Sequence, residues 1–155
     1  MSAHTLNMLA ICALLVLGAN SKAYALTCSI TSSGMAFGTY NTLSASSLDT
    51  TGALTVECDD SFTATLSADL GTGLGASHAT GRKMTGANPA ALLTYHLYAD
   101  AARSQVLGDG TGGSVTIQLN GTATYNLPLY GRITGGQHSI PAGSYLDSVM
   151  VTVSY

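Results

Sequence analysis

The chain has 155 residues, only 8% of them charged, and its formal net charge is −3. Proteins that bind nucleic acid need clustered Lys and Arg side chains to displace counterions from phosphate, and the five basic residues here are scattered, which excludes nucleic acid as a main partner. The length is sufficient for one domain, and few charged residues with 18 glycines and many Ser and Thr favour an all-β protein.

The amino-terminal 25 residues have the features of a secretory signal peptide. Residues 8–19 form an uncharged apolar run, and Ala23-Tyr24-Ala25 supplies the small-x-small pattern of a signal-peptidase site. The run is about a dozen residues long, whereas a membrane-spanning helix needs ~20. We therefore expect an exported protein with a signal peptide at residues 1–25, one domain at residues 26–155 and no membrane span in the mature chain.

Two cysteines, Cys28 and Cys58, remain in the predicted mature chain after Cys12 leaves with the signal peptide. An even number of cysteines in an exported chain indicates a disulfide, which would close a loop of about 30 residues and stabilise the fold by ~3 to ~4 kcal/mol in the chain-entropy model. The alternatives are a redox pair, whose cysteines are two residues apart in known motifs, and a metal pair, which needs further ligands nearby. A structural disulfide is favoured, with Cα atoms roughly 4.4–6.8 Å apart.

Short alternations of apolar and polar residues recur downstream and predict β-strands. They lie at residues 54–58, 62–66, 93–98, 115–119, 122–125 and 148–155. No stretch after residue 26 shows a helical period with caps, and many short strands at this spacing indicate a β-sandwich. The expected core consists of inward-facing strand residues, among them Phe37, Leu54, Val56, Leu66, Leu97, Ile117, Leu129 and Ile133.

Three loop regions separate these runs. Residues 69–88 are weakly patterned and predict a surface connection with one short strand near residues 82–84. Residues 108–113 match the G-x-G-x-x-G pattern of dinucleotide-binding proteins, but a predicted strand follows instead of a helix, so the glycines indicate a turn with positive φ angles. Asn120 and Gly121 separate two alternating runs and predict a tight β-hairpin, because both residue types tolerate positive φ.

No catalytic or metal-binding pattern emerges from the polar residues. The mature histidines, His78, His96 and His138, are 18 and 42 residues apart and have no acidic partner at ligand spacing. Residues 75–79 approximate the nucleophile elbow G-x-S-x-G, but the last glycine is missing and the required strand and helix are absent from the pattern. We therefore expect no enzyme, no cofactor and no metal site.

Five ordered segments resemble the spore coat protein U domain family, whose members include subunits of archaic chaperone–usher pili. They are Thr27-Cys28 with residues 36–40, residues 55–58, residues 95–103, residues 129–133, and residues 141–147 leading into residues 151–155. Residues 95–103 are similar to the family's Tyr-x-[Leu/Val]-Tyr-x-Asp-Ala-Ala-Arg. The resemblance covers essentially the whole predicted mature chain.

The resemblance implies an incomplete immunoglobulin-like β-sandwich that lacks its final strand. A periplasmic chaperone would lend a strand to the open groove, and a neighbouring subunit's amino-terminal extension would replace that strand in a fibre assembled through an outer-membrane usher. An unfilled groove exposes apolar core and unpaired backbone groups, which is an aggregation hazard. The side chains expected to face the groove from the carboxy-terminal strand are Val149, Val151, Val153 and Tyr155, because they are apolar and share one face.

One departure from the family concerns the donor segment. If cleavage follows Ala25, only Leu26 and Thr27 precede Cys28, whereas pilins that donate a strand carry an alternating extension there. This favours a terminal or accessory subunit, or a coat-type secreted protein, over a repeating shaft subunit. The leading interpretation is a non-enzymatic structural subunit of a surface pilus or coat. The alternatives are a carbohydrate- or surface-binding adhesin whose Gly-rich loops touch the ligand, and a secreted enzyme of unrecognised type.

Overall fold

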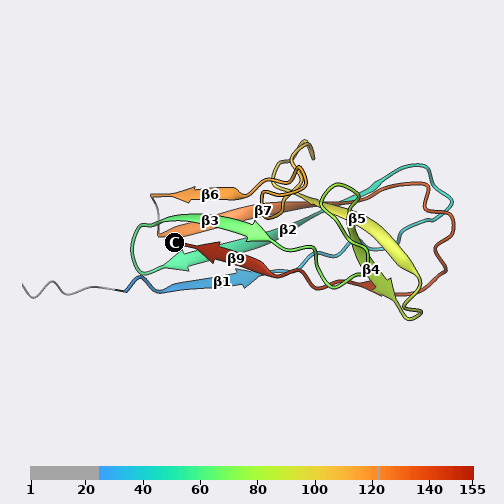
Figure 1. The fold of residues 1–155 in the computed structure, drawn as a ribbon, viewed down its shortest axis with the longest axis horizontal. Helices are drawn as coiled ribbons and strands as arrows, with labels where there is room; N and C mark the ends of the chain where they lie inside the picture. Colours follow the sequence, from blue (N-terminus) through green and yellow to red (C-terminus); the bar gives the residue numbers. More distant parts are fainter. Residues whose placement is uncertain (1–24, 122) are drawn as a thin grey trace, which may run out of the picture.

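The structure is a computed structural model that describes residues 25–121 and 123–155, so the predicted signal peptide lies outside the described residues except for Ala25. The described residues form nine β-strands and no helix (Figure 1). The strands are β1 Cys28–Ser32, β2 Leu48–Cys58, β3 Thr63–Ala68, β4 Arg82–Gly86, β5 Leu92–Tyr98, β6 Ile117–Asn120, β7 Thr124–Ile133, β8 Tyr145–Leu146 and β9 Val151–Ser154. No helix in this part of the chain could therefore cross a membrane.

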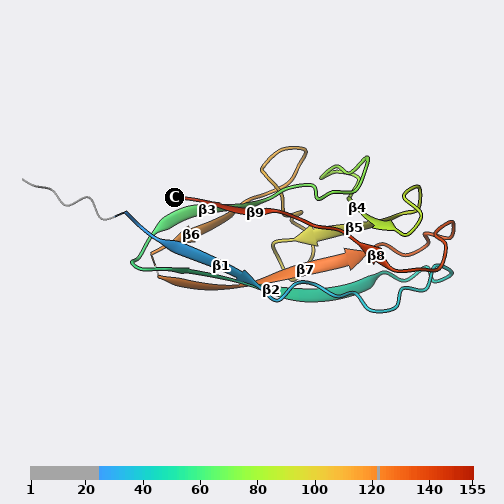
Figure 2. The same ribbon diagram turned by 90° about the horizontal axis from the view of Figure 1, so that it is seen from below.

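The strands form two layers, seen edge-on in Figure 2. A six-stranded sheet has the order β1-β2-β7-β5-β4-β8, a three-stranded sheet has the order β6-β3-β9, and all of these neighbours are antiparallel. Apolar side chains from both sheets fill the space between the layers. The predicted all-β, incomplete immunoglobulin-like sandwich is thus confirmed.

Period-two alternation explains which side chains reach the core. In β3, Ala64, Leu66 and Ala68 are buried, while the residues between them face outward, as expected for a strand with one face on the core. Six of the eight predicted core residues are buried, namely Leu54, Val56, Leu66, Leu97, Leu129 and Ile133. The other two, Phe37 and Ile117, are half-buried and pack against the same cluster.

The predicted disulfide is present and joins β1 to β2. Cys28 and Cys58 lie directly opposite each other in the antiparallel register, and their Cα atoms are 4.1 Å apart. This distance is slightly below the expected range of roughly 4.4–6.8 Å. The bridge fixes the first strand at one edge of the six-stranded sheet.

The hairpin predicted at Asn120-Gly121 is wrong. β6 pairs with β3 in the small sheet, whereas β7 pairs with β2 and β5 in the large one, so the connection carries the chain from one sheet to the other. Gly121 does adopt a positive φ of 88°, and its N–H donates to the carbonyl of Phe62. The local turn signal was therefore correct, but long-range pairing of β7 with the eleven-residue strand β2 decides the partner.

Two other loop predictions agree with the structure. β4 is the short strand expected near residues 82–84. In the Gly-rich segment, Gly110, Gly112 and Gly113 have positive φ angles, and the hydroxyl of Ser114 donates to the carbonyl of Thr111 to close the turn. The segment is thus a turn, and no helix follows it.

Candidate functional site

One side of the sandwich presents an uncovered strand edge from each of the two sheets. β1 ends the large sheet and β9 ends the small one, on the same side of the molecule (Figures 1 and 2). β1 pairs only with β2 and β9 only with β3 among the described strands. Each strand therefore presents one edge that no other described strand covers.

A groove of about 770 Å³ adjoins these edges, at Ser32 where β1 ends and at Val151 where β9 begins. One wall is formed by residues 34–40, which follow β1, and the other by residues 140–151, which lead into β9. Core side chains form the floor, namely Met84, Leu93, Tyr95, Leu97, Leu129 and Ile133. The groove thus opens directly onto the hydrophobic core.

The lining of the groove is apolar. Met35 and Phe37 contribute from one wall, Ile140, Val149 and Val151 from the other. Apart from tyrosines, the one ionisable side chain among the lining residues is Asp147, whose carboxylate is already occupied by hydrogen bonds from the protein. Such a lining suits apolar side chains spaced along an extended segment.

The four side chains predicted to face the groove occupy different positions. Val149 and Val151 line it, and Val153 is half-buried against the core one alternation further along. Tyr155 is 64% exposed and lies beside Leu26 and Phe62 at a second, shallower hollow. The structure therefore brings three of the four onto the inward face and places Tyr155 at the end of the sandwich.

The intervening residues of the same segment face outward. Met150 is 68% exposed, and Thr152 and Ser154 are exposed as well. The two faces of β9 are thus distinct, with one turned to the core and one to solvent.

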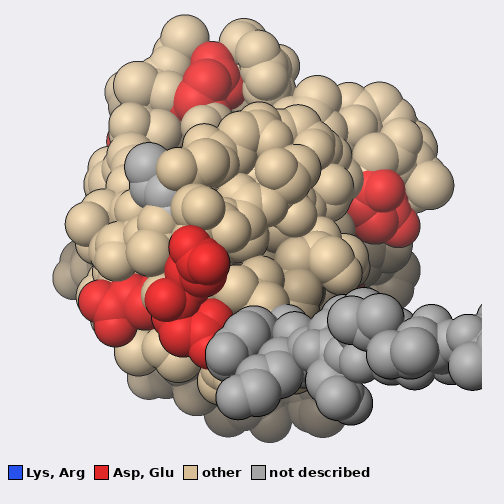
Figure 3. All heavy atoms as spheres, turned by 90° about the vertical axis from the view of Figure 1, so that its left-hand side faces the viewer, with Lys and Arg blue, Asp and Glu red and all other residues tan. Residues whose placement is uncertain are grey.

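The end of the sandwich where β1 begins and β9 ends is acidic. Figure 3 views this end and shows Asp and Glu side chains but no Lys or Arg among the described residues in view. Glu57, Asp59 and Asp60 lie at this end, where β2 finishes. A partner that contacts this end is therefore expected to be neutral or basic there.

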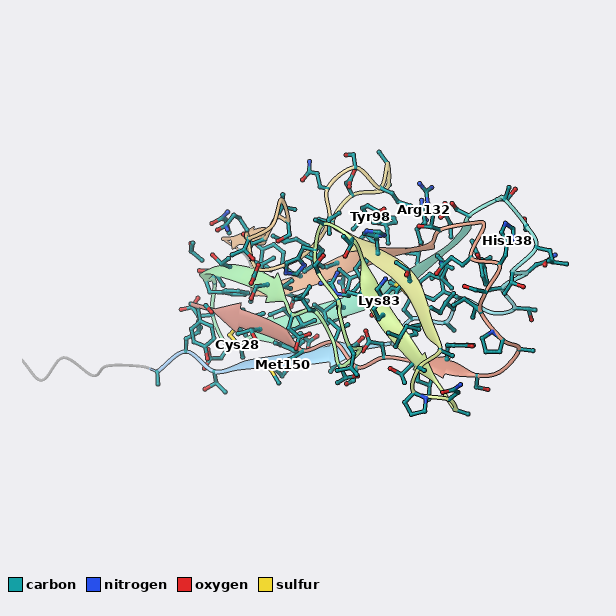
Figure 4. The ribbon with its side chains drawn as sticks, turned by 45° about the vertical axis from the view of Figure 1, so that its right-hand side comes forward. Cys28, Lys83, Tyr98, Arg132, His138 and Met150 are labelled. Atoms are coloured by element: carbon teal, nitrogen blue, oxygen red, sulfur yellow. A yellow bond between two sulfur atoms is a disulfide. The ribbon has the colours of Figure 1, made fainter. Side chains whose placement is uncertain are left out.

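Polar residues in two of the family-like segments meet on the outside of the large sheet. Arg132 on β7 donates two hydrogen bonds to Asp49, at 2.7 and 2.9 Å. Figure 4 shows Arg132 near Tyr98 of β5. Arg103 lies 3.5 Å from the same carboxylate and 5.7 Å over the ring of Tyr130. The hydrogen bonds from Arg132, and secondarily the charges of Arg103 and Arg132, hold the pKa of Asp49 below its usual value. These residues join β2, β7 and the turn after β5, which is a structural role.

The three histidines do not form a site. His78 is buried with its Nε2 3.2 Å from Asp109, the ring of His96 stacks on Tyr98, and Nδ1 of His138 lies 2.7 Å from the carbonyl of Thr42. In residues 25–121 and 123–155, no three His, Cys, Asp or Glu side chains gather as metal ligands would. The groove is therefore the candidate functional site.

Sequence reasoning missed a buried polar group behind the groove. Arg82 is only 1% exposed and donates to the backbone carbonyls of Asp69 and Leu107. Near it, Asp69 accepts a hydrogen bond from Met150 of the wall formed by residues 140–151, and Asp147 of the same wall accepts one from Thr72. Arg82 and Lys83 at the start of a predicted short strand were the available signal, because two charged residues in succession on a strand point to opposite faces, and the inward one needs partners for its donors.

Comparisons with known proteins agree with this geometry. No curated protein matches the chain. Among solved structures, it is similar to a chain in the crystal structure of the CsuC–CsuE chaperone–tip adhesion subunit pre-assembly complex from archaic chaperone–usher Csu pili of Acinetobacter baumannii, with a TM-score of 0.62 and 19% identity. The match covers 84% of this chain and 40% of that chain. The model of the Spore Coat Protein U domain matches residues 14–152. The chain therefore belongs to the Spore Coat Protein U domain family.

Proposed function

We propose that this protein is a non-enzymatic structural subunit of a surface pilus or coat, and that its groove accepts a β-strand from another protein. The observation that supports this most strongly is the apolar groove of about 770 Å³, which meets the uncovered edges of β1 and β9 at Ser32 and Val151. An added strand would pair its backbone with these edges and place alternate apolar side chains on the core. It would also remove the aggregation hazard of two open edges.

The proposed donors are a periplasmic chaperone during export and a second subunit after assembly through an outer-membrane usher. The similarity to a chain in a chaperone–subunit complex supports the first of these donors. In this proposal the predicted signal peptide, residues 1–25, directs the chain to the periplasm, and the mature protein ends at the cell surface in a fibre or coat. Val149 and Val151 line the groove, and Val153 and Tyr155 continue their alternation toward the end of the sandwich.

The proposal is tested by supplying the missing strand covalently. In the self-complemented version, a Gly-rich turn and an extended segment with alternate apolar residues follow Tyr155. We expect the unmodified protein, expressed in the periplasm without a chaperone, to aggregate or be degraded, and the self-complemented version to be a soluble monomer with a distinctly higher melting temperature. Gel filtration and thermal unfolding measure both. A stable unmodified monomer whose melting temperature the added strand leaves unchanged would contradict the proposal.

We further propose a terminal or accessory position in the assembly. Cleavage after Ala25 would leave Leu26 and Thr27 before Cys28, and Thr27 is held against its own domain. Its N–H donates to the carboxylate of Asp59, and its carbonyl accepts from the N–H of the same residue, both at 3.1 Å. A segment of Leu26 and Thr27, with Thr27 bound to Asp59, is too short to reach the groove of another subunit.

Mass spectrometry of the secreted protein tests this position. We expect the mature amino terminus at Leu26, and we expect the protein to capture a donor strand without donating its own amino terminus to the open groove of a second copy. A longer mature amino terminus with alternating apolar residues would instead indicate a shaft subunit.

A further inference from the structure

The carboxy-terminal wall of the groove changes sheets along its length. β8 pairs with β4 in the large sheet, whereas β9 pairs with β3 in the small one. Residues 147–150 make the crossing without pairing to a strand in the described sheets. β9 pairs through four residues with β3 and with no other described strand, so contacts outside the sheets are needed to hold this crossing in place.

Asp147 fixes the start of the crossing. Its Oδ1 accepts hydrogen bonds from the N–H and the hydroxyl of Thr72, at 2.7 and 3.0 Å, and its Oδ2 accepts from the hydroxyl of Tyr95 at 2.7 Å. Burial and the adjacent carboxylate raise the pKa of the Tyr95 hydroxyl, so it stays a donor. A side chain at Gly71 would collide with this carboxylate, which shows how closely the loop after β3 packs on it. The wall is thereby tied both to that loop and to the central strand β5.

Asp69 fixes the end of the crossing. Its N–H donates to the carbonyl of Met150 at 3.0 Å, and the N–H of Met150 donates to Oδ1 of Asp69 at 2.9 Å. This is the next position of the β3–β9 ladder, where the partner's carbonyl would ordinarily accept. Here the carboxylate takes its place.

Arg82 explains why the side chain of Asp69, and not its backbone carbonyl, accepts the hydrogen bond from the N–H of Met150. That carbonyl accepts from Nε and Nη2 of Arg82, at 2.9 and 2.6 Å, and so points into the protein. Nη2 also donates to the carbonyl of Leu107 at 2.9 Å. None of the ion pairs in the described part of the chain involves Arg82, so its buried charge depends on these carbonyls. A buried, hydrogen-bonded arginine therefore sets the orientation of Asp69.

We propose that Asp69 and Asp147, supported by Arg82, are positioning residues that hold residues 147–151 as a preformed wall of the empty groove. The inference rests on the proposed function of the groove as a strand acceptor. A wall that is ordered before binding spares the incoming strand the entropic cost of ordering it. Once a strand is in place, its own backbone bonds hold the wall, and the two aspartates become partly redundant. Their loss should therefore weaken capture of a strand more than it destabilises the filled protein.

The chain offers a matched pair of variants at Asp69. Both bonds that this side chain accepts, from Gly71 and Met150, use Oδ1, so Asp69→Asn keeps the acceptor and Asp69→Ala removes it. Asp147→Ala is the second variant, and Asp60→Asn, at an exposed carboxylate outside the groove lining, is the control.

The experiment compares capture with stability. Unfolded protein is diluted from denaturant into increasing concentrations of a synthetic peptide with alternate apolar residues, and the concentration for half-maximal recovery of monomer is measured. The melting temperature of each variant is measured in the self-complemented version. We expect Asp69→Ala and Asp147→Ala to raise the half-maximal concentration about tenfold, because each variant loses two or more hydrogen bonds that the carboxylate accepts, with little change in the melting temperature of the filled form. Asp69→Asn and Asp60→Asn should behave as the parent protein.

The possible outcomes distinguish a failure of the role assigned to Asp69 and Asp147 from a failure of the proposed strand-acceptor function. Failure of the parent protein to capture the peptide at any concentration would reject the strand-acceptor function, and the inference with it. Normal capture by the parent together with unchanged capture by both alanine variants would reject the inference alone. Equal losses in capture and in the melting temperature of the filled form would also reject it, because the aspartates would then stabilise the fold in general.

Discussion

Val151→Asp is expected to abolish strand capture, whereas Thr152→Asp is expected to leave it nearly intact. Val151 is half-buried and lines the groove, and Thr152, the next residue on β9, is exposed on the other face. An incoming strand would bury the new carboxylate at position 151 among apolar side chains without a partner, which is costly enough to decide binding. At position 152 the carboxylate remains in water.

The comparison controls for damage to the strand itself. Both residues belong to the β3–β9 ladder, Val151 opposite Ala68 and Thr152 opposite Ser67, so each substitution perturbs the same element. Co-purification with a periplasmic chaperone and peptide capture on refolding are the two measurements. Equal capture by the two variants would show that the groove proposed here is not where the strand binds.

Much of the fold was predictable because its determinants are local. The inward faces of β3 and β5 follow from alternation, and the side chains expected there, such as Leu66 and Leu97, are buried. The disulfide followed from the cysteine count in an exported chain. The uncovered edge of β9 came from the family-like segments, since no local pattern distinguishes a strand with one neighbour from a strand with two.

The features that escaped prediction depend on contacts between distant segments. The Asn120-Gly121 turn has the positive φ expected, but the identity of the strand beside β7 is set by residues more than sixty positions earlier in β2. Asp69 and Arg82 belong to a weakly patterned connection, and their roles become visible only where the fold brings Asp69 to Met150 and Arg82 to the carbonyl of Asp69. Tyr155 continues the alternation of β9 in sequence, yet its surroundings are those of the end of the sandwich, beside Phe62. Alternation predicts the face of the strand on which a side chain lies, but it does not predict which other segments pack against that face.

Two core truncations should each destabilise the self-complemented version strongly. Leu66 is fully buried on β3 and Leu97 is 8% exposed on β5. Replacing either by Ala removes buried methyl groups and leaves a cavity, so we expect each variant to lose ~2–5 kcal/mol of unfolding free energy in chemical denaturation. A variant that unfolds at the parent's denaturant concentration would show that its side chain does not face the core.

The two truncations should differ in whether the added strand can repair them. Leu97 lines the groove, whereas Leu66 packs between Ile117 on β6 and Val153 on β9, outside the groove lining. Enlarging one apolar side chain of the added strand should therefore refill the space left by Leu97→Ala and recover much of the lost stability, since volume-conserving exchanges in a core are well tolerated. The same series of enlarged strands should leave Leu66→Ala unrepaired, because the cavity lies under β3, the middle strand of the small sheet, away from the groove lining. Repair of both variants, or of neither, would mean that the added strand does not lie on the floor of the groove, and the geometry proposed for strand capture would have to be redrawn.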